Sequence, residues 1–497
     1  MDTSTGVVFP VSNTANMAES HEEERSSSAF GRAVVAEALA SVDAAGADAA
    51  QRDTGWRRGY PQHLRRLVEV GATDHRAAMA IARDGLASVH DRMCWLPASG
   101  GHDRSLADAF ATPLPHARWD SVTVAGEGAA ETEFTLPYKG TRLQGDALRE
   151  RLDGWVTDGV IEPGVRDAVN KVLDNPDWLD VRDRTFVVLG AGAEMGPLRS
   201  LLRWGGRVVG IDLPRPALWS SLFNVARQGA GSLVVPVAAG RADASDPAQH
   251  AGADLLHDIG GVGDYLLALD GPFVLGNYVY ADGGVNLRLS AATDALALHL
   301  SQRDDVALAY LATPTDVFVV PDGAVAQANS GLDSAFLKSV RRPLRMLSGG
   351  RLLQRQYPPH PSGASLSDTI VPQQGPNYLL AKRIHRWRAA AAAADGQLVS
   401  MNIAPPTRTR SVTKNRALAA AYAGAHRFGV EVFDPSTANT LMAAMLVHDL
   451  RTGGYAAKGD MWQAEAAGAA HGGLWRSPYD PRSALGIAAV LGFGSAR

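Results

Sequence analysis

The sequence predicts an α/β fold, a Rossmann-like doubly wound parallel sheet with a largely helical N-terminal domain. After residue 180, short apolar runs alternate with segments of helical periodicity, a pattern typical of parallel strands joined by right-handed crossovers. The first of these runs, residues 186–189, leads directly into a glycine-rich turn at residues 190–196. Before residue 180, apolar side chains recur mostly at helical spacing, as they do from Val34 to Leu39.

The composition divides the chain into three regions. Residues 1–28 are polar and rich in Ser, Thr and Glu, which indicates a disordered tail. Residues 29–180 are expected to form the helical domain, with loops and a strand or two at residues 122–136. Residues 181–497 are expected to form the Rossmann-type domain, interrupted by an insertion at about residues 316–375.

Turn signals and helical segments bound the strands that follow the glycine turn. A second strand ends just before Asp212, and helices are expected at residues 286–301 and 378–394. Four more strands are expected at residues 232–237, 273–277, 306–311 and 397–403.

The glycine turn has the pattern of a dinucleotide-binding site and reads Gly190-Ala191-Gly192-Ala193-Glu194-Met195-Gly196. Gly190 and Gly192 let the backbone approach a pyrophosphate closely, and a helix after the turn offers free N–H groups and a positive dipole end. Asp212 lies 22 residues after Gly190, where an acid can accept hydrogen bonds from the ribose of adenosine. The pattern favours a dinucleotide. A methyltransferase-type nucleotide fold and a purely structural turn are the alternatives.

The charge of Asp212 favours NAD as the cofactor, because a carboxylate at this place repels the 2′-phosphate of NADP. Arg215 lies three residues later and could accommodate such a phosphate, so NADP stays an alternative. Glu194 is an unfavourable charge near the expected pyrophosphate unless its side chain turns outward.

Tyr378 and Lys382 are four residues apart in a segment of helical periodicity. Positions i and i+4 share one face of a helix, so the ammonium can lie beside the phenol. A neighbouring cation favours phenolate and lowers the pKa of a tyrosine from its usual value of about 10. The pair therefore predicts a proton donor and acceptor that works near neutral pH, although taken alone it also fits an exposed pair without a function.

The composition excludes several other classes of protein. The formal net charge is −4 over 497 residues, so no strong field would attract nucleic acid or an anionic membrane. No apolar run approaches the ~18 residues of a membrane span, and residues 1–28 lack the features of a signal peptide. The single cysteine, Cys94, suits a reducing compartment, and no metal-binding motif is present. We therefore expect a cytoplasmic protein without a metal.

The order of these motifs resembles the short-chain dehydrogenase/reductase superfamily over about half of the chain. Gly190 and Gly196 match the first and last glycines of the family's turn, whereas Glu194 takes the place of the middle glycine. Within the turn, the resemblance adds Met195 to the residues that contact the cofactor. Outside the turn it implies four further cofactor contacts, Asp243, Asn277, Ile403 and Thr407.

The family's catalytic set is an asparagine, a serine, a tyrosine and a lysine. The resemblance assigns these roles to Asn286, Thr313, Tyr378 and Lys382, with a threonine in place of the serine. Thr313 is preferred because it directly follows the fifth strand. Thr315, two residues later, and Ser365, 13 residues before Tyr378, are the alternatives for the hydroxyl.

The insertion carries a run of basic side chains, Lys338, Arg341, Arg342, Arg345, Arg351 and Arg355. One interpretation is a clamp for a carboxylate, a phosphate or a thioester-carrier tail. The alternative is a solvated basic face. Apolar neighbours such as Phe336 and Leu337 suit either an apolar substrate or a packed lid.

These features predict an NAD(P)-dependent oxidoreductase that interconverts a carbonyl and an alcohol by hydride transfer. Thr313 would bond the carbonyl oxygen, Tyr378 would donate the proton, and Lys382 would hold the ribose. Asn286 would position a water relay. The expected partner is a small-molecule substrate, apolar or with an anionic tail, and we expect a homo-oligomer. A non-catalytic nucleotide-binding protein and an S-adenosylmethionine-dependent methyltransferase are the alternatives.

Overall fold

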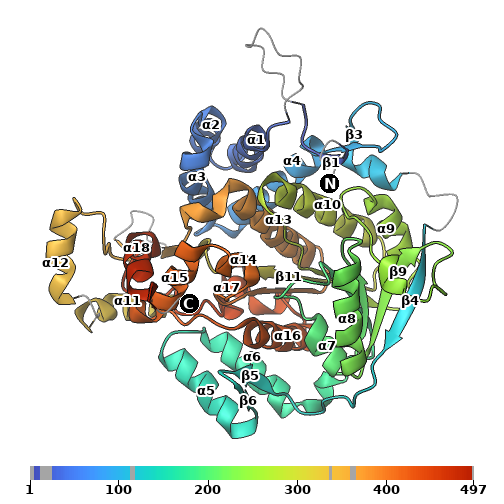
Figure 1. The fold of residues 1–497 in the computed structure, drawn as a ribbon. Coiled ribbons are helices and arrows are strands. Elements are labelled where there is room, and N and C mark those ends of the chain that lie inside the picture. The colour runs from blue at the N-terminus through green and yellow to red at the C-terminus, as the bar shows by residue number, and fades with distance from the viewer. Residues whose placement is uncertain (1–4, 12–24, 112–117, 335–337, 359–364, 495–497) are drawn as a thin grey trace.

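The computed structural model describes residues 5–11, 25–111, 118–334, 338–358 and 365–494 (Figure 1). Its centre is a seven-stranded sheet with the order β14-β11-β10-β7-β8-β9-β4, in which only the edge strand β4 is antiparallel. This sheet confirms the predicted Rossmann-like α/β fold. Its strands are β4 (Trp119–Ala125), β7 (Thr185–Leu189), β8 (Arg207–Ile211), β9 (Ser232–Ala238), β10 (Phe273–Asn277), β11 (Val306–Ala312) and β14 (Val399–Ile403).

The chain winds outward from the middle of the sheet in two directions. β7, β8 and β9 follow one another towards one edge, and the chain then returns to place β10, β11 and β14 on the other side of β7. The strand order therefore reverses between β7 and β10. In doubly wound sheets the carboxyl ends of the strands leave a crevice at this point.

Side chains that alternate along each strand belong to two separate hydrophobic cores, one on each face of the sheet. In β7, Val187 and Leu189 pack beneath α9, α10 and α13, whereas Phe186 and Val188 pack beneath α7, α8 and α16. Both faces are covered, which explains why the strands are almost wholly apolar. The covering helices are α7 (Leu198–Arg203), α8 (Pro216–Gln228), α9 (Ile259–Leu267), α10 (Gly283–Leu300), α13 (Gly375–Ala394) and α16 (Pro435–Thr452).

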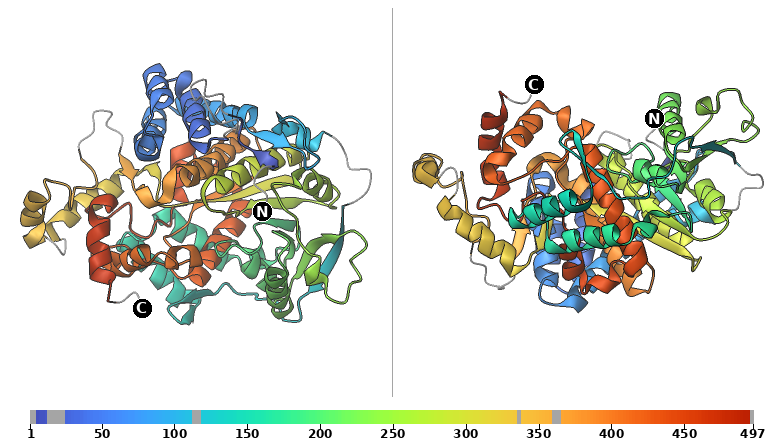
Figure 2. Two further views of the ribbon diagram at one scale, coloured as in Figure 1. Left: turned by 45° about the horizontal axis from the view of Figure 1, so that its top comes forward. Right: turned by 90° about the horizontal axis from the view of Figure 1, so that it is seen from below.

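Residues 29–180, predicted as a helical domain, contribute to both cores and to the sheet. Helices α1 to α4 pack over α10 and α13 on one side, and α5 and α6 pack on the opposite side (Figure 2). Between these groups, β4 pairs with β9 at the sheet edge. The division into domains stays a prediction. The bounds are α1 (Ser27–Ala40), α2 (Ala44–Arg52), α3 (Trp56–Gly71), α4 (His75–Arg92), β2 (Cys94–Leu96), β3 (Arg104–Ser105), β5 (Leu136–Tyr138), β6 (Thr141–Leu143), α5 (Gly145–Thr157) and α6 (Pro163–Asp174).

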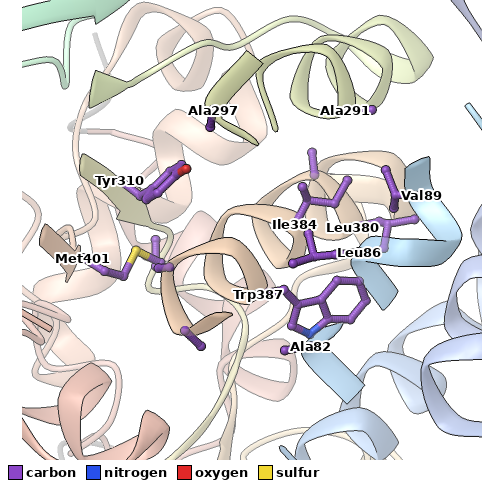
Figure 3. Close-up of a cluster of buried hydrophobic side chains, with 14 of the residues drawn as sticks. Ala82, Leu86, Val89, Ala291, Ala297, Tyr310, Leu380, Ile384, Trp387 and Met401 are labelled. Carbon is purple, nitrogen blue, oxygen red and sulfur yellow. The ribbon is translucent and has the colours of Figure 1, made fainter. Parts of the chain in front are cut away.

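The contact between α4 and α13 fixes the N-terminal helices to the rest of the molecule. Leu86 and Val89 of α4 lie in the same buried cluster as Ile384 and Trp387 of α13 (Figure 3). Gly85 makes room for the indole, because a Cβ atom at this position would lie 2.5 Å from Cζ3 of Trp387. The indole is 1% exposed, so this packing contributes substantially to stability.

A buried ion triad joins the same helices. Asp294 of α10 accepts hydrogen bonds from Arg388 of α13 at 2.9 and 2.8 Å. Nε2 of His90, on α4, lies 2.7 Å from Oδ2 of the same carboxylate. Asp294 is 2% exposed, and its charge is therefore matched inside the protein.

The first residues differ from the predicted disordered tail. Residues 1–4 and 12–24 lie outside the described part of the chain, but Gly6–Val8 form the strand β1, which pairs with β2. Val7 is fully buried, and Arg288 of α10 donates hydrogen bonds to the carbonyl groups of Thr5 and Val7. Burial of apolar side chains offsets the entropy lost by fixing this short segment.

The predicted insertion has the strand β12 near its start and β13 near its end, and these two strands pair as an antiparallel ladder. Helices α11 and α12 lie between these strands, and α12 stands away from the sheet (Figure 1). At the base, Asp316 accepts hydrogen bonds from Arg383 (2.5 Å) and Arg386 (2.7 Å), and Arg386 also bonds Glu465 of α17 (2.6 Å). The bounds are β12 (Val317–Val319), α11 (Asp322–Ser334), α12 (Lys338–Leu347), β13 (Leu366–Asp368) and α17 (Met461–Ala467).

Candidate functional site

A cleft of about 1620 Å³ opens at the carboxyl ends of the parallel strands. Its lining includes residues that directly follow four strands, Gly190 after β7, Asp212 after β8, Tyr278 after β10 and Thr313 after β11. The cleft lies beside the point where the strand order reverses, which is where doubly wound sheets bind their ligands.

The glycine turn forms one end of the cleft. Gly190 has a φ of +78°, and a Cβ atom there would lie 3.1 Å from the carbonyl of Tyr278, so both its conformation and its surroundings require glycine. Gly192 donates its N–H to Asp212 Oδ2 at 2.9 Å. A Cβ atom at Gly192 would lie 2.6 Å from Leu218 Cδ1. The turn is thus fixed to the end of β8, because Gly190 and Ala191 also donate their N–H groups to the carbonyl of Ile211.

Asp212 lies in the cleft where the sequence predicts a ribose-binding acid. Its carboxylate accepts the N–H groups of Gly192 (2.9 Å) and Leu213 (2.8 Å). Burial raises the pKa of Asp212, and these two backbone hydrogen bonds act in the opposite direction. Each oxygen keeps acceptor capacity for a ligand hydroxyl.

The helix after the glycine turn differs from the expected one. α7 begins at Leu198, eight residues after Gly190, and has only six residues. Pro197 precedes it and has no N–H to offer. An α7 dipole directed at a pyrophosphate is therefore not part of this site, and Glu194 and Met195 of the turn itself line the cleft there.

Glu194 turns towards the opposite wall of the cleft. Its carboxylate accepts the backbone N–H of Arg410 (2.8 Å) and the Nε–H of the same residue (3.2 Å). Arg410 begins the short helix α14 (Arg410–Thr413), and both residues line the cleft. The negative charge that the sequence left unexplained is thus matched by a cation across the opening. Met195 and Thr407 also line the cleft.

Tyr378 and Thr313 meet in the middle of the cleft. Tyr378 lines the cleft beside Thr313, which counteracts the rise in the pKa of the phenol that burial causes. The Oγ1 of Thr313 lies 2.9 Å from Oγ1 of Thr315. Gln374 donates to the Thr315 hydroxyl at 2.6 Å. Ser365, the rival for the hydroxyl, lies before β13 outside the cleft lining. Three hydroxyl groups from two separate segments thus line the cleft together, and those of Thr313 and Thr315 are hydrogen-bonded to each other.

Lys382 lies one helical turn after Tyr378 and also lines the cleft. Its Nζ donates to the carbonyl of Leu311 at 3.4 Å, and burial lowers its pKa to about 8. Burial raises the pKa of Tyr378, while the side chain of Thr313 acts in the opposite direction. This differs from the expectation that the lysine lowers the pKa of the phenol, because removal from water outweighs the other effects on Tyr378.

Two predicted asparagines lie outside the lining of the cleft. Asn277 donates to Thr293 of α10 at 2.8 Å and lies 3.3 Å from His385 Nε2. Asn286 accepts the backbone N–H of Ala281 at 3.0 Å. Both amides are 3% exposed, and buried amides must satisfy their polar atoms locally. They hold the segment after β10 and do not face the cleft.

Three other predicted contacts also lie outside the lining. Gly196 is buried within the turn, Ile403 is fully buried at the end of β14, and Asp243 is exposed in a turn after β9. Asp254 and Leu255 line the cleft in the region expected for Asp243. The sequence did not point to these two residues, because ten residues separate Asp243 from Asp254. The run Ala253-Asp254-Leu255, an acid between two apolar residues, is the pattern that could have indicated them.

The arginines of the insertion do not form a clamp at the cleft. None of Arg341, Arg342, Arg345, Arg351 and Arg355 lines it, and the side chain of Lys338 lies outside the described part of the structure. Arg341 and Arg345 donate to the backbone carbonyl of Leu353 (3.4 and 3.3 Å), and Arg355 donates to Asn329 (3.0 Å). These guanidinium groups satisfy the insertion's own backbone and side chains. Phe336 and Leu337 lie outside the described residues.

Comparison with known proteins leaves the family open. No protein-family model and no curated protein matches the sequence. Among solved structures, the chain is similar to a thiolation-reductase di-domain from an archaeal non-ribosomal peptide synthetase, with 13% sequence identity and a TM-score of 0.27. The match spans 56% of this chain and 56% of that chain. In the part of the chain that the structure describes, no helix combines the length and apolarity needed to cross a membrane.

Proposed function

We propose that the protein is an NAD(P)-dependent oxidoreductase of the short-chain dehydrogenase/reductase type that interconverts a carbonyl and an alcohol. One observation carries this proposal. Thr313, Tyr378 and Lys382 line the same cleft as Gly190 and Gly192 of the glycine turn. A proton donor, a polar group for an oxygen and a dinucleotide cradle thus share one cavity.

The described residues fit a dinucleotide. Gly190 lets the turn lie against the backbone after β10, and Gly192 and Ala193 line the cleft beside it. Asp212 would accept the ribose hydroxyls, and its charge favours NAD over NADP. Arg410 would face the pyrophosphate from the wall opposite the glycine turn. Thr407, and Met195 of the turn itself, would line the same part of the cleft. Arg215 also lines the cleft and keeps NADP as the alternative.

Chain residues would then control the proton and the oxygen of the substrate. The nicotinamide supplies or accepts the hydride when it is bound. Thr313 would donate a hydrogen bond to the carbonyl oxygen as negative charge develops there, and Tyr378 would give that oxygen its proton. Lys382, with a pKa of about 8, would be cationic at neutral pH and hold a ribose hydroxyl. The raised pKa of Tyr378 keeps the phenol protonated, which suits it to begin a reduction as the acid.

A non-catalytic nucleotide-binding protein is the second candidate. It is favoured by Asn286, which bonds Ala281 and does not face the cleft, so the family's water relay lacks its expected residue. A methyltransferase that binds S-adenosylmethionine would leave Tyr378 and Lys382 without a role. Cytoplasmic localisation and a homo-oligomer remain our predictions, and light scattering on the purified protein tests the oligomer.

The decisive experiment follows the absorbance of NADH and NADPH at 340 nm with a panel of aldehydes and ketones. Turnover of at least one carbonyl compound supports the oxidoreductase. Dinucleotide binding without turnover of any compound favours the non-catalytic protein, and binding of S-adenosylmethionine alone favours the methyltransferase. Calorimetry with each of the three ligands distinguishes these outcomes.

Tyr378→Phe tests the mechanism. The variant should lose activity by about 100-fold or more, because it removes the proton donor, and should keep the dinucleotide Kd within about twofold. Tyr280→Phe is the matched control, since Tyr280 lines the same cleft with its ring centroid 6.2 Å from that of Tyr378. Equal activity of the two variants would remove Tyr378 from the mechanism.

A further inference from the structure

The cleft is larger than one cofactor needs. Pockets for single small molecules typically measure about 300–1,000 Å³, whereas this one measures about 1620 Å³. Beyond Tyr378 it continues between α15 (Arg416–Gly424), the short helix η5 (Ala425–Phe428) and α18 (Pro481–Gly492). We call this part the apolar arm and define it by Leu418, Tyr422, Phe428, Val430, Leu474 and Leu485.

The helices α15 and α18 each contribute a continuous stripe of lining residues to the apolar arm. On α15 and into η5, the lining residues are spaced at i, i+3, i+4 and i+7, starting at Leu418. On α18 the same spacing starts at Pro481 and includes Leu485. Residues at this spacing share one face of a helix, so each helix turns a whole side towards the cleft.

Close contact between the two helices fixes these stripes. A Cβ atom at Gly424 of α15 would lie 2.0 Å from the carbonyl oxygen of Ala488, and one at Gly492 of α18 would lie 2.0 Å from that of Ala420. The small-residue faces therefore pack against each other, and the larger side chains Leu418 and Leu485 remain at the cleft. The arm is a built part of the fold.

The lining of the apolar arm lacks charge. Among the described residues that α15, η5 and α18 contribute to it, none is charged. Asp212, Asp254, Lys382 and Arg410 line other parts of the cleft, and Lys414, which also lines it, lies just before α15 begins. Tyr422 marks the junction with the proposed reaction centre. Burial, together with the neighbouring Tyr378, raises its pKa to about 12, so it stays neutral.

We propose that the substrate carries an extended hydrocarbon group, which occupies the apolar arm while its carbonyl carbon faces Thr313 and Tyr378. The proposal rests on the oxidoreductase function for the identity of the reacting group, whereas the binding of a hydrocarbon chain rests on the arm alone. Apolar surface leaves water when such a chain enters a lining without charge, and affinity rises with chain length while the arm has room.

The test compares unbranched aldehydes from butanal to decanal in the 340 nm assay. In the wild-type protein kcat/KM should rise about threefold for each added methylene, which amounts to about 700-fold over the six methylenes of the series. Leu485→Glu should flatten this gradient, so that the loss in kcat/KM grows from butanal to decanal. Val490→Glu is the matched control, because Val490 lies on the same helix, is 76% exposed and does not line the cleft.

A binding assay separates this proposal from the oxidoreductase function. 1-Anilinonaphthalene-8-sulfonate is bound to the full-length protein and displaced with 1-decanol, with 1-butanol as the comparison. Displacement by decanol in the wild type and the Val490→Glu variant, but not in Leu485→Glu, supports the arm even where no aldehyde turns over. Turnover without a chain-length gradient overturns it, and so does displacement that Leu485→Glu leaves unchanged.

Discussion

The two walls of the cleft are held in place in different ways. The wall that carries Tyr378 and Lys382 belongs to α13, whose base is fixed by the fully buried Asp316 and by Trp387. The facing wall, which begins with α14, contacts the glycine turn through Arg410, whose side chain is 77% exposed. Buried charges with matched partners resist displacement, whereas an exposed ion pair opens at little cost. The comparison indicates one rigid wall for chemistry and one wall that can adjust to a ligand.

The largest effect is expected at the base of the rigid wall. Asp316→Ala should lower the free energy of unfolding by about 3–5 kcal/mol, because it leaves Arg383 and Arg386 partly uncompensated inside the protein. Chemical denaturation measures this difference. Asp395→Ala is the control: its bridge to Arg83 at the end of α13 is exposed, and its removal should cost less than about 1 kcal/mol. Similar losses for both variants would contradict the comparison.

The glycine turn should give the next largest effect. Gly190→Ala forces a side chain into a positive φ and against the carbonyl of Tyr278, so we expect a loss of about 1–3 kcal/mol in stability. The Kd of NADH should rise by about tenfold in calorimetry, because the turn must move. At Gly196 a Cβ atom would lie 3.4 Å from the carbonyl of Ala193, an ordinary contact. Gly196→Ala should therefore leave both quantities nearly unchanged.

The pH profile of kcat/KM tests the charge of Lys382. Its pKa of about 8 lies below the ordinary value, so the cation is present below pH 8 and is lost above it. A mechanism that needs the cation predicts a fall in kcat/KM of up to about tenfold per pH unit above 8. Lys382→Arg keeps its charge over this range and should shift the fall upward. The same alkaline limb in this variant would assign the titration to another group.

The smallest effect is expected at the adjustable wall. Glu194→Gln removes a negative charge beside the proposed pyrophosphate position and frees Arg410, so the Kd of NADH should fall by about two- to fivefold at low salt. The change should shrink at 0.5 M salt, since exposed charges are screened. Arg416→Ala, a nearby exposed substitution outside the cleft lining, should change the Kd by less. An effect of Glu194→Gln that is independent of salt would contradict a charge-based role.

The sheet could be predicted because each strand is a local apolar run bounded by turns. The pairing of β4 with β9 could not, since it joins residues more than 100 positions apart and depends on an edge left open by the other strands. Buried polar groups were equally hard to place. Asn277 has partners on α10 and α13, and a sequence does not reveal which neighbour will satisfy a buried amide. The distance of α7 from the turn was also hard to predict, because Pro197 is compatible with either side of a helix boundary.

The contact between α4 and α13 has a practical consequence. A shortened gene that starts near residue 100 would still encode every side chain of the proposed reaction centre. The resulting polypeptide would nevertheless expose the indole of Trp387 and leave Arg388 and Asp294 without His90. Such a fragment should aggregate or require detergent. Anyone who trims this protein for crystallisation or display should therefore cut elsewhere.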